Sequence, residues 1–331
     1  MCSLMAGCGR DQFRSPFIKS IFMTEMSRPM NGWKRVLEFF IGPVFVRPLC
    51  FFRIGAGLLI AWQGFHWLPD ATELFSNEGF QIQYRTRLFE WGHLAPSPAS
   101  AKAICCGLAM GGIALAAGLL TKLALVGVMM VWTFLAGLEH VAYKELMMVW
   151  HLILILLLFT PCGRFYSMDS WLRDRWKPDK ANPEEMMPGL MFRMLQVVFL
   201  QYYFFPGLVK FMEPTWRNGT ALASTMVCRM ATDFGLWIAS WMPMFGYVVL
   251  SLGIIFYEVT AAWGLTSRRW LGWYVLAGLT FHIGIQLTLD LDVGTLGPIF
   301  MLALVCLFAI PGGLIWPRHF LPKSTGDKFA L

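Results

Sequence analysis

Eight stretches of the sequence are each long and apolar enough to cross, or nearly cross, a lipid bilayer. A spanning α-helix needs about 20 mostly apolar residues. Inside a bilayer a segment has to satisfy its own backbone polar groups, so such stretches are expected to be helical. The sequence therefore predicts an all-α integral membrane protein, a bundle of about eight transmembrane helices without a sizeable water-soluble domain. The eight stretches are Leu49–Leu68, Ile104–Leu120, Leu123–Val141, Leu146–Thr160, Met194–Phe211, Met244–Gly264, Leu271–Leu289 and Leu296–Leu314.

Composition supports this reading of the apolar stretches. Hydrophobic residues make up 57% of the 331 residues and charged residues only 14%, whereas about a quarter of a soluble domain is charged. We divide the chain into a basic, partly disordered N-terminal segment (1–46), a transmembrane domain (47–315) and a short cytoplasmic tail (316–331). We expect a multi-pass protein of the plasma membrane or of an inner membrane.

The distribution of Lys and Arg predicts which side of the bilayer each loop occupies. With eight spans and both termini in the cytoplasm, 18 of these residues fall on the cytoplasmic side and 5 on the opposite side. Cytoplasmic loops carry such an excess of basic residues. The net charge of +7 is thus a consequence of topology. Nucleic-acid binding is the poorer explanation, because no soluble fold accompanies the basic residues.

Lys210 is the first candidate for chemistry, because a charge within a span costs at least about 2.5–3.5 kcal/mol at a helix centre. It lies near the predicted exoplasmic end of its span, after Pro206, which would kink the helix, and Gly207, which permits close approach. An amine partly withdrawn from water there could act as a base. The alternative is that Lys210 reaches the headgroups and pairs with Glu213, three residues on.

Four further polar residues lie within predicted spans. Glu258 and His282 could lie at similar depth and hydrogen-bond to each other, either as part of a site or as a clasp between two helices. Arg53 needs an acidic or carbonyl partner, and Glu258 is one possibility. His151, alone on an apolar helix, is expected to be a structural polar residue in the membrane. No metal-ligand spacing appears in the sequence.

Several of these residues belong to a recurring pattern. After the fourth span comes a Ser-x-Asp triplet, the fifth span carries an aromatic–Gly–Lys–Trp–Gly series, and an acidic residue and a Phe-His pair follow in later spans. The residues are Ser167-Met168-Asp169, then Tyr203-Phe204, Gly207, Lys210, Trp216 and Gly219, then Glu258 and Phe281-His282. Through them the chain resembles the HTTM family, the membrane module shared with vitamin K-dependent γ-carboxylases.

The resemblance implies a function. It implies that Lys210 is the base that deprotonates a quinol such as vitamin K hydroquinone, with Tyr203, Gly207, Trp216, Glu258 and His282 forming the quinol pocket. The modified substrate would be a membrane-proximal one, such as a secreted peptide or another membrane protein. The sequence establishes no cofactor, and a quinone such as vitamin K hydroquinone is the one that the resemblance implies.

The sequence departs from the carboxylases at the start of the fourth span, and it is also consistent with a different function. Carboxylases have an Asn-His pair entering the fourth span, where this chain has Lys144-Glu145, so we expect quinol binding or oxidation to be retained more readily than peptide carboxylation. The alternative is a non-catalytic membrane partner or assembly subunit, whose lipid-facing helices dock another membrane protein.

Overall fold

The structure of the protein is a computed structural model that describes residues 32–79, 95–138, 145–176, 185–228, 231–289 and 296–311. Most of the predicted N-terminal segment (1–31) and the whole predicted tail (316–331) lie outside these residues. Within 32–46 the chain forms a helix and a short strand.

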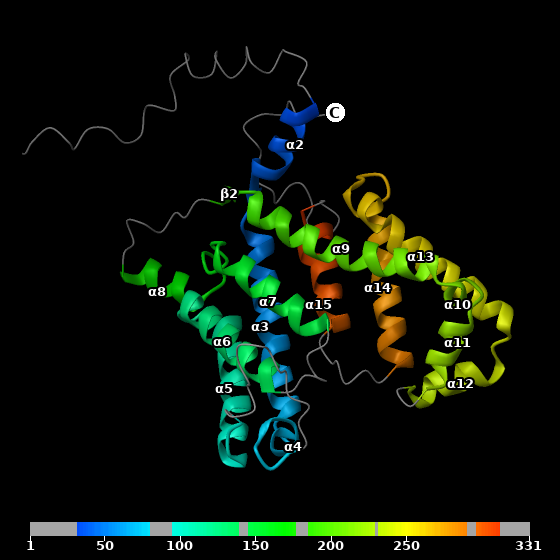
Figure 1. Ribbon diagram of the computed structural model, residues 1–331. Helices are drawn as coiled ribbons and strands as arrows, with labels where there is room; N and C mark the ends of the chain where they lie inside the picture. Colours follow the sequence, from blue (N-terminus) through cyan, green and yellow to red (C-terminus); the bar gives the residue numbers. More distant parts are fainter. Residues whose placement is uncertain are drawn as a thin grey trace, which may run out of the picture.

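The described chain is almost entirely helical (Figure 1). Its longer helices are α2 (Gly32–Ile41), α3 (Arg47–Trp67), α5 (Pro98–Ala117), α6 (Thr121–Leu138), α7 (Glu145–Leu158), α8 (Met168–Trp176), α9 (Leu190–Met212), α12 (Asp233–Trp241), α13 (Met244–Thr266), α14 (Leu271–Thr288) and α15 (Leu296–Ala303), which continues as the π-helix η4 (Leu304–Ala309). The short helices are α4 (Ala71–Phe75), α10 (Pro214–Arg217) and α11 (Thr220–Met226). Two strands, β1 (Pro43–Phe45) and β2 (Met186–Pro188), pair antiparallel, with Val44 opposite Met187.

A helix occupies each of the eight predicted spans. Among the described residues five helices, α3, α5, α6, α9 and α13, are long and apolar enough to cross a membrane. The other predicted spans contain α7, α14 and α15 with η4, which fall short in length or in hydropathy. An all-α membrane protein is therefore what the structure supports, and the count of eight and the side of each terminus stay predictions.

Helices α3 and α5 pack backbone against backbone along a row of small residues. A Cβ added at Gly112 would lie 2.4 Å from the backbone nitrogen of Ala61, and one added at Gly57 would lie 2.4 Å from that of Ala116. Helices in a bilayer gain most of their attraction from such close packing, because lipid tails are as apolar as the side chains. The small residues of α3 and α5 therefore set how closely the first half of the bundle packs.

We predict that Gly112→Val lowers the melting temperature of the purified protein, since the new side chain has to push α3 and α5 apart. Overpacking of this kind costs about 1–3 kcal/mol. The control is Gly107→Val on the same helix, where an added Cβ meets nothing within 4 Å. Equal melting temperatures for the two variants would contradict the tight α3–α5 contact.

Arg53 is fully buried on α3, and all its described hydrogen bonds go to backbone carbonyls. Nη1 donates to the carbonyls of Leu115 (2.5 Å) and Ala116 (2.9 Å), at the end of α5. Nε and Nη2 donate to two carbonyls in the segment after α7, those of Cys162 (3.1 Å) and Tyr166 (2.6 Å). A cation at a helix C-terminus is favourable because the last carbonyls point towards it.

The possibility that Arg53 pairs with Glu258 is therefore wrong. The guanidinium instead ties α3 to α5 and to the chain leading into α8. Gly118, which ends α5 in the left-handed conformation (φ 67°), has to be a glycine here, since a Cβ would lie 2.6 Å from Arg53 Nη1.

Asp169 caps the start of α6. Its carboxylate accepts hydrogen bonds from the backbone N–H of Leu120 (2.8 Å) and from the backbone N–H (2.8 Å) and hydroxyl (2.7 Å) of Thr121. Burial alone would raise the pKa of Asp169, but these hydrogen bonds and the Arg53 guanidinium hold it below its ordinary value of 3.8. The aspartate of the Ser-x-Asp triplet thus satisfies helix donors that would otherwise lack partners.

We predict that Asp169→Asn destabilises the protein by about 1–2 kcal/mol near neutral pH, because charged caps are stronger than neutral ones. The pKa of Asp169 is lowered on folding, so this stabilisation is complete above its ordinary value and disappears as the pH falls through the folded-state value. Melting temperatures of the wild type and Asp169→Asn should therefore differ near neutral pH and approach each other as the pH falls below 3.8. Asp174→Asn, at an exposed position on the same helix, is the control. A difference between wild type and Asp169→Asn that does not depend on pH would contradict the assignment.

The second half of the protein is built on α9 and α13, which lie side by side (Figure 1). At the far end of this pair lie the short helices α10, α11 and α12. The hydroxyl of Ser251 on α13 donates to the carbonyl of Trp216 on α10 (2.5 Å), and that of Thr232 donates to the carbonyl of Leu287 on α14 (2.6 Å). These contacts place Trp216 next to the last turn of α9.

Candidate functional site

Lys210 in the last turn of α9 forms an ion pair with Glu258 of α13. Its Nζ lies 2.5 Å from Oε1 and 2.7 Å from Oε2 of the carboxylate. The Lys210 side chain is 19% exposed and that of Glu258 is 5% exposed, so water screens the pair poorly. The amine is within hydrogen-bonding distance of both carboxylate oxygens, the geometry of a charge-assisted pair. Glu258, not Glu213, is the partner of Lys210, and the snorkelling alternative is not the arrangement found.

Gly207 allows α9 to come close enough to α13 for this pair to form. A Cβ at Gly207 would lie 2.6 Å from the Cβ of Glu258 and 3.0 Å from the backbone nitrogen of Val259. The sequence indicated that Gly207 permits close approach, either of a backbone or of a flat ligand. In the structure that approach is made by the backbone of α13.

Trp216 covers the other side of the Lys210 amine. Its ring centroid lies 5.1 Å from Nζ, a distance at which the ring attracts a cation. Gly219, three residues later, adopts a left-handed conformation (φ 78°) and would place a Cβ 2.7 Å from the backbone nitrogen of Val248. The last glycine of the sequence pattern is thus required by the turn that positions Trp216 and by its contact with α13.

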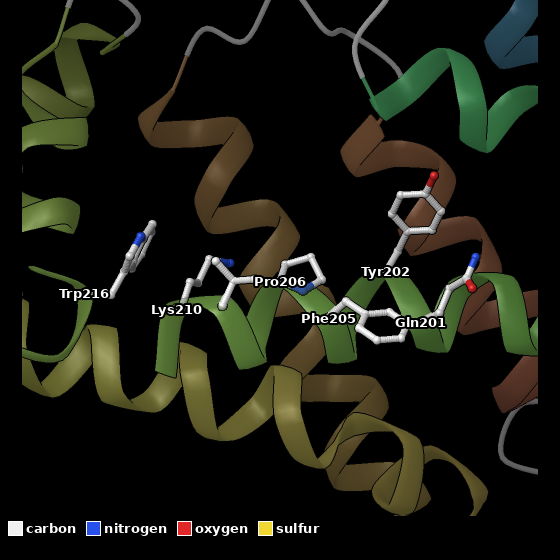
Figure 2. Close-up of a pocket in the computed structure, with 7 residues that line it drawn as sticks. Gln201, Tyr202, Phe205, Pro206, Lys210 and Trp216 are labelled. Atoms are coloured by element: carbon white, nitrogen blue, oxygen red, sulfur yellow. The ribbon is translucent and has the colours of Figure 1, made fainter. Parts of the chain in front are cut away.

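An apolar groove with a volume of about 520 Å³ runs along α9 and ends at Lys210. Figure 2 shows Tyr202, Pro206 and Lys210 following one another along the helix, with Trp216 facing the lysine. Phe205 is 59% exposed and Val209 is 65% exposed, so the groove is open on the side where lipid would lie. The sequence indicated Lys210 and Trp216, but the other residues that line the groove could be identified only from the face of α9 on which they lie. They are Gln201, Tyr202, Phe205, Pro206 and Val209.

Pro206 interrupts the helical hydrogen bonds along the groove. It has no backbone N–H and cannot donate the helical hydrogen bond to the carbonyl of Tyr202, one turn earlier. Helix α9 continues through this position, and Pro206 itself lines the groove.

Tyr203 and His282 form a second polar contact, which shares no residue with the Lys210–Glu258 pair. Tyr203 Oη lies 2.8 Å from His282 Nε2, and both residues are buried. The ring of Phe300 packs against both of them, with centroid distances of 5.2 Å. The expectation of a hydrogen bond between Glu258 and His282 is therefore wrong, since each bonds to a residue of α9.

His151, the remaining candidate, lies elsewhere. Its Nε2 is 2.8 Å from the hydroxyl of Thr133 on α6, so it links α7 to α6. Of the eight candidates, Lys210 and Trp216 line the groove, and Arg53 lies on α3 with its own partners. Among the described residues no three His, Cys, Asp or Glu side chains gather as metal ligands would.

We predict that Gly207→Ala lowers the melting temperature, because the methyl group forces α9 away from Glu258 and strains the buried ion pair. The cost of such overpacking is about 1–3 kcal/mol. The control is Gly253→Ala on α13, where an added Cβ meets nothing within 4 Å. If Gly207→Ala melts like Gly253→Ala, the close approach of α9 and α13 is not a requirement of the fold.

Comparison with known protein families identifies one match. The HTTM domain matches residues 43–312, a range that contains the helices from α3 to η4 and all of the candidate residues. No curated protein and no solved structure matches the chain. The chain belongs to the HTTM domain family.

Proposed function

We propose that this HTTM-domain membrane protein binds a quinol in the groove on α9 and oxidises it, with Lys210 as the base. The observation that carries the proposal is that Lys210, paired with Glu258, lines one end of an apolar groove on α9 together with Trp216. Its volume of about 520 Å³ lies in the range of about 300–1,000 Å³ common for ligand pockets. A flat ring in the groove would meet the aromatic side chains of Tyr202, Phe205 and Trp216, which line it.

The ion pair determines how Lys210 could act as a base. The amine is paired and protonated, so its extra proton has to move to Glu258 before it can accept another. This transfer runs along an existing contact of 2.5 Å. It converts two charges into two neutral groups, so the surrounding low-dielectric region gains no net charge. Glu258 is thus the proton acceptor for Lys210 in the proposed mechanism.

A quinol supplies a weakly acidic hydroxyl and, after deprotonation, two electrons for dioxygen. In the groove the Gln201 amide can hydrogen-bond to a ring oxygen at one end, while Lys210 accepts the proton from the other end. Trp216 keeps the amine from bulk water. Modification of a membrane-proximal substrate, in the plasma membrane or an inner membrane, would follow from this oxidation.

Lys210→Arg tests the base directly. Arginine keeps the positive charge and can pair with Glu258, but it does not lose its proton in a protein. We expect quinol-dependent oxygen uptake by the purified protein to fall by about 10²–10⁴-fold, the usual contribution of a general base, with little change in melting temperature. Lys210→Ala should also abolish uptake, although it leaves Glu258 buried without its partner.

Lys102→Ala, at an exposed position on α5, is the control and should retain full uptake. Uptake that survives in Lys210→Arg would reject the base. In that case the ion pair is a clasp between α9 and α13, and co-purification of a stoichiometric membrane protein would favour the role of an assembly subunit.

A further inference from the structure

Helix α2 exposes a row of large apolar side chains at the opposite end of α9 from the groove. Trp33, Leu37 and Ile41 follow at intervals of four residues and are 74%, 48% and 52% exposed, and Val36 beside them is 47% exposed. Residues at this spacing share one face of a helix. Helix α2 therefore has an apolar face that no described part of the chain covers.

Polar residues alternate with the apolar ones in the sequence of α2. Lys34, Arg35 and Glu38 occupy positions between the apolar ones, so the ten-residue helix is amphipathic. A short helix with large apolar residues on one face and basic residues on the other is typical of segments that lie in a membrane surface. In water such a helix is too short to be stable alone.

The attachment of α2 fixes its depth relative to the bilayer. The backbone N–H of Gly189 donates to the carbonyl of Ile41 (3.3 Å), and Arg193 Nε donates to the carbonyl of Phe39 (3.2 Å). The Arg193 guanidinium also lies 4.4 Å from the centroid of the Phe39 ring. Because α9 is long and apolar enough to span a membrane, its first turn marks one membrane boundary. Helix α2 is held at that boundary, and Figure 1 shows it beyond the bundle, next to β2.

The segments around α2 carry an excess of basic residues. In the described ranges 32–47, 164–176 and 185–193 there are seven Lys or Arg and four Asp or Glu. The basic residues are Lys34, Arg35, Arg47, Arg164, Arg173, Arg175 and Arg193, and the acidic ones are Glu38, Asp169, Asp174 and Glu185. These segments are in contact, since Arg47 pairs with Glu185 and lies over the ring of Phe165. This end of the molecule is also the predicted cytoplasmic side, where lipids are anionic.

We propose that α2 binds the surface of an anionic lipid leaflet, with Trp33, Val36, Leu37 and Ile41 inserted among the acyl chains and the basic residues against the headgroups. Exposed Trp171 (53%) and Trp176 (77%) on α8 extend the same surface, because tryptophan favours the membrane interface. The proposal does not depend on any activity of the Lys210 site.

Hydrogen–deuterium exchange of the full chain in nanodiscs tests this interaction. Amides of Gly32–Ile41 should exchange on the order of tenfold more slowly in discs that contain phosphatidylserine than in phosphatidylcholine discs, because each basic residue near an anionic surface adds attraction. High salt should reduce the difference. The double variant V36D/L37D should lose the protection, while Glu38→Gln should keep or increase it. Unchanged exchange in α3 and α9 shows that each variant is folded.

Three outcomes would overturn the proposal. Rapid exchange of α2 in both kinds of disc means that lipid does not cover the apolar row. Equal protection in both discs that V36D/L37D abolishes means that anionic lipid is not the partner. If protection is equal in both discs and V36D/L37D leaves it intact, then another part of this chain or a second copy covers α2, and lipid does not.

Discussion

The second half of this protein depends on one buried ion pair, between Lys210 and Glu258. An isolated charge in a low-dielectric region is costly, and a buried pair is stable only when its geometry is good. Here the amine reaches both carboxylate oxygens, and the Trp216 ring covers it from the other side. All three side chains are positioned by features of the backbone: the close contact at Gly207, the left-handed turn at Gly219 and the hydrogen bond from Ser251 to the Trp216 carbonyl.

The same constraint explains where the polar groups of the first half lie. Among the described residues Arg53 forms no salt bridge with a carboxylate, and its hydrogen bonds go to four carbonyls at a helix end and in the following segment. These carbonyls would otherwise need water, which a bilayer does not provide. In the same way, the Asp169 carboxylate accepts hydrogen bonds from the N–H groups at the start of α6. The two halves thus use opposite solutions, pairing of side chains in one and capping of helix ends in the other.

Much of the helical architecture could be predicted from the sequence, because each apolar stretch specifies a helix without reference to its neighbours. The importance of Lys210, Gly207 and Gly219 could be predicted as well, since charges and glycines stand out in apolar surroundings. Their partners could not. Glu258 faces Lys210 rather than His282 because of the rotation of α13 about its axis, and no local pattern specifies that rotation. The sequence suggested an acidic partner for Arg53 for a similar reason. Every residue has a backbone carbonyl, so no sequence position stands out as the carbonyl partner of an arginine.

The residues that line the groove could be identified only from the three-dimensional structure. Gln201, Tyr202 and Phe205 are unremarkable in an aromatic span, and they line the groove only because α9 turns that face outwards while Glu258 holds the opposite side of its last turn. The proline that interrupts the helical hydrogen bonds lies on the outward face, one turn before the lysine. A ligand in the groove would therefore meet the ring of Tyr202 and the amine of Lys210 along one face of α9, about two helical turns apart. That spacing, set by the pitch of one helix, is the physical basis for treating α9 as the element that binds and orients the substrate.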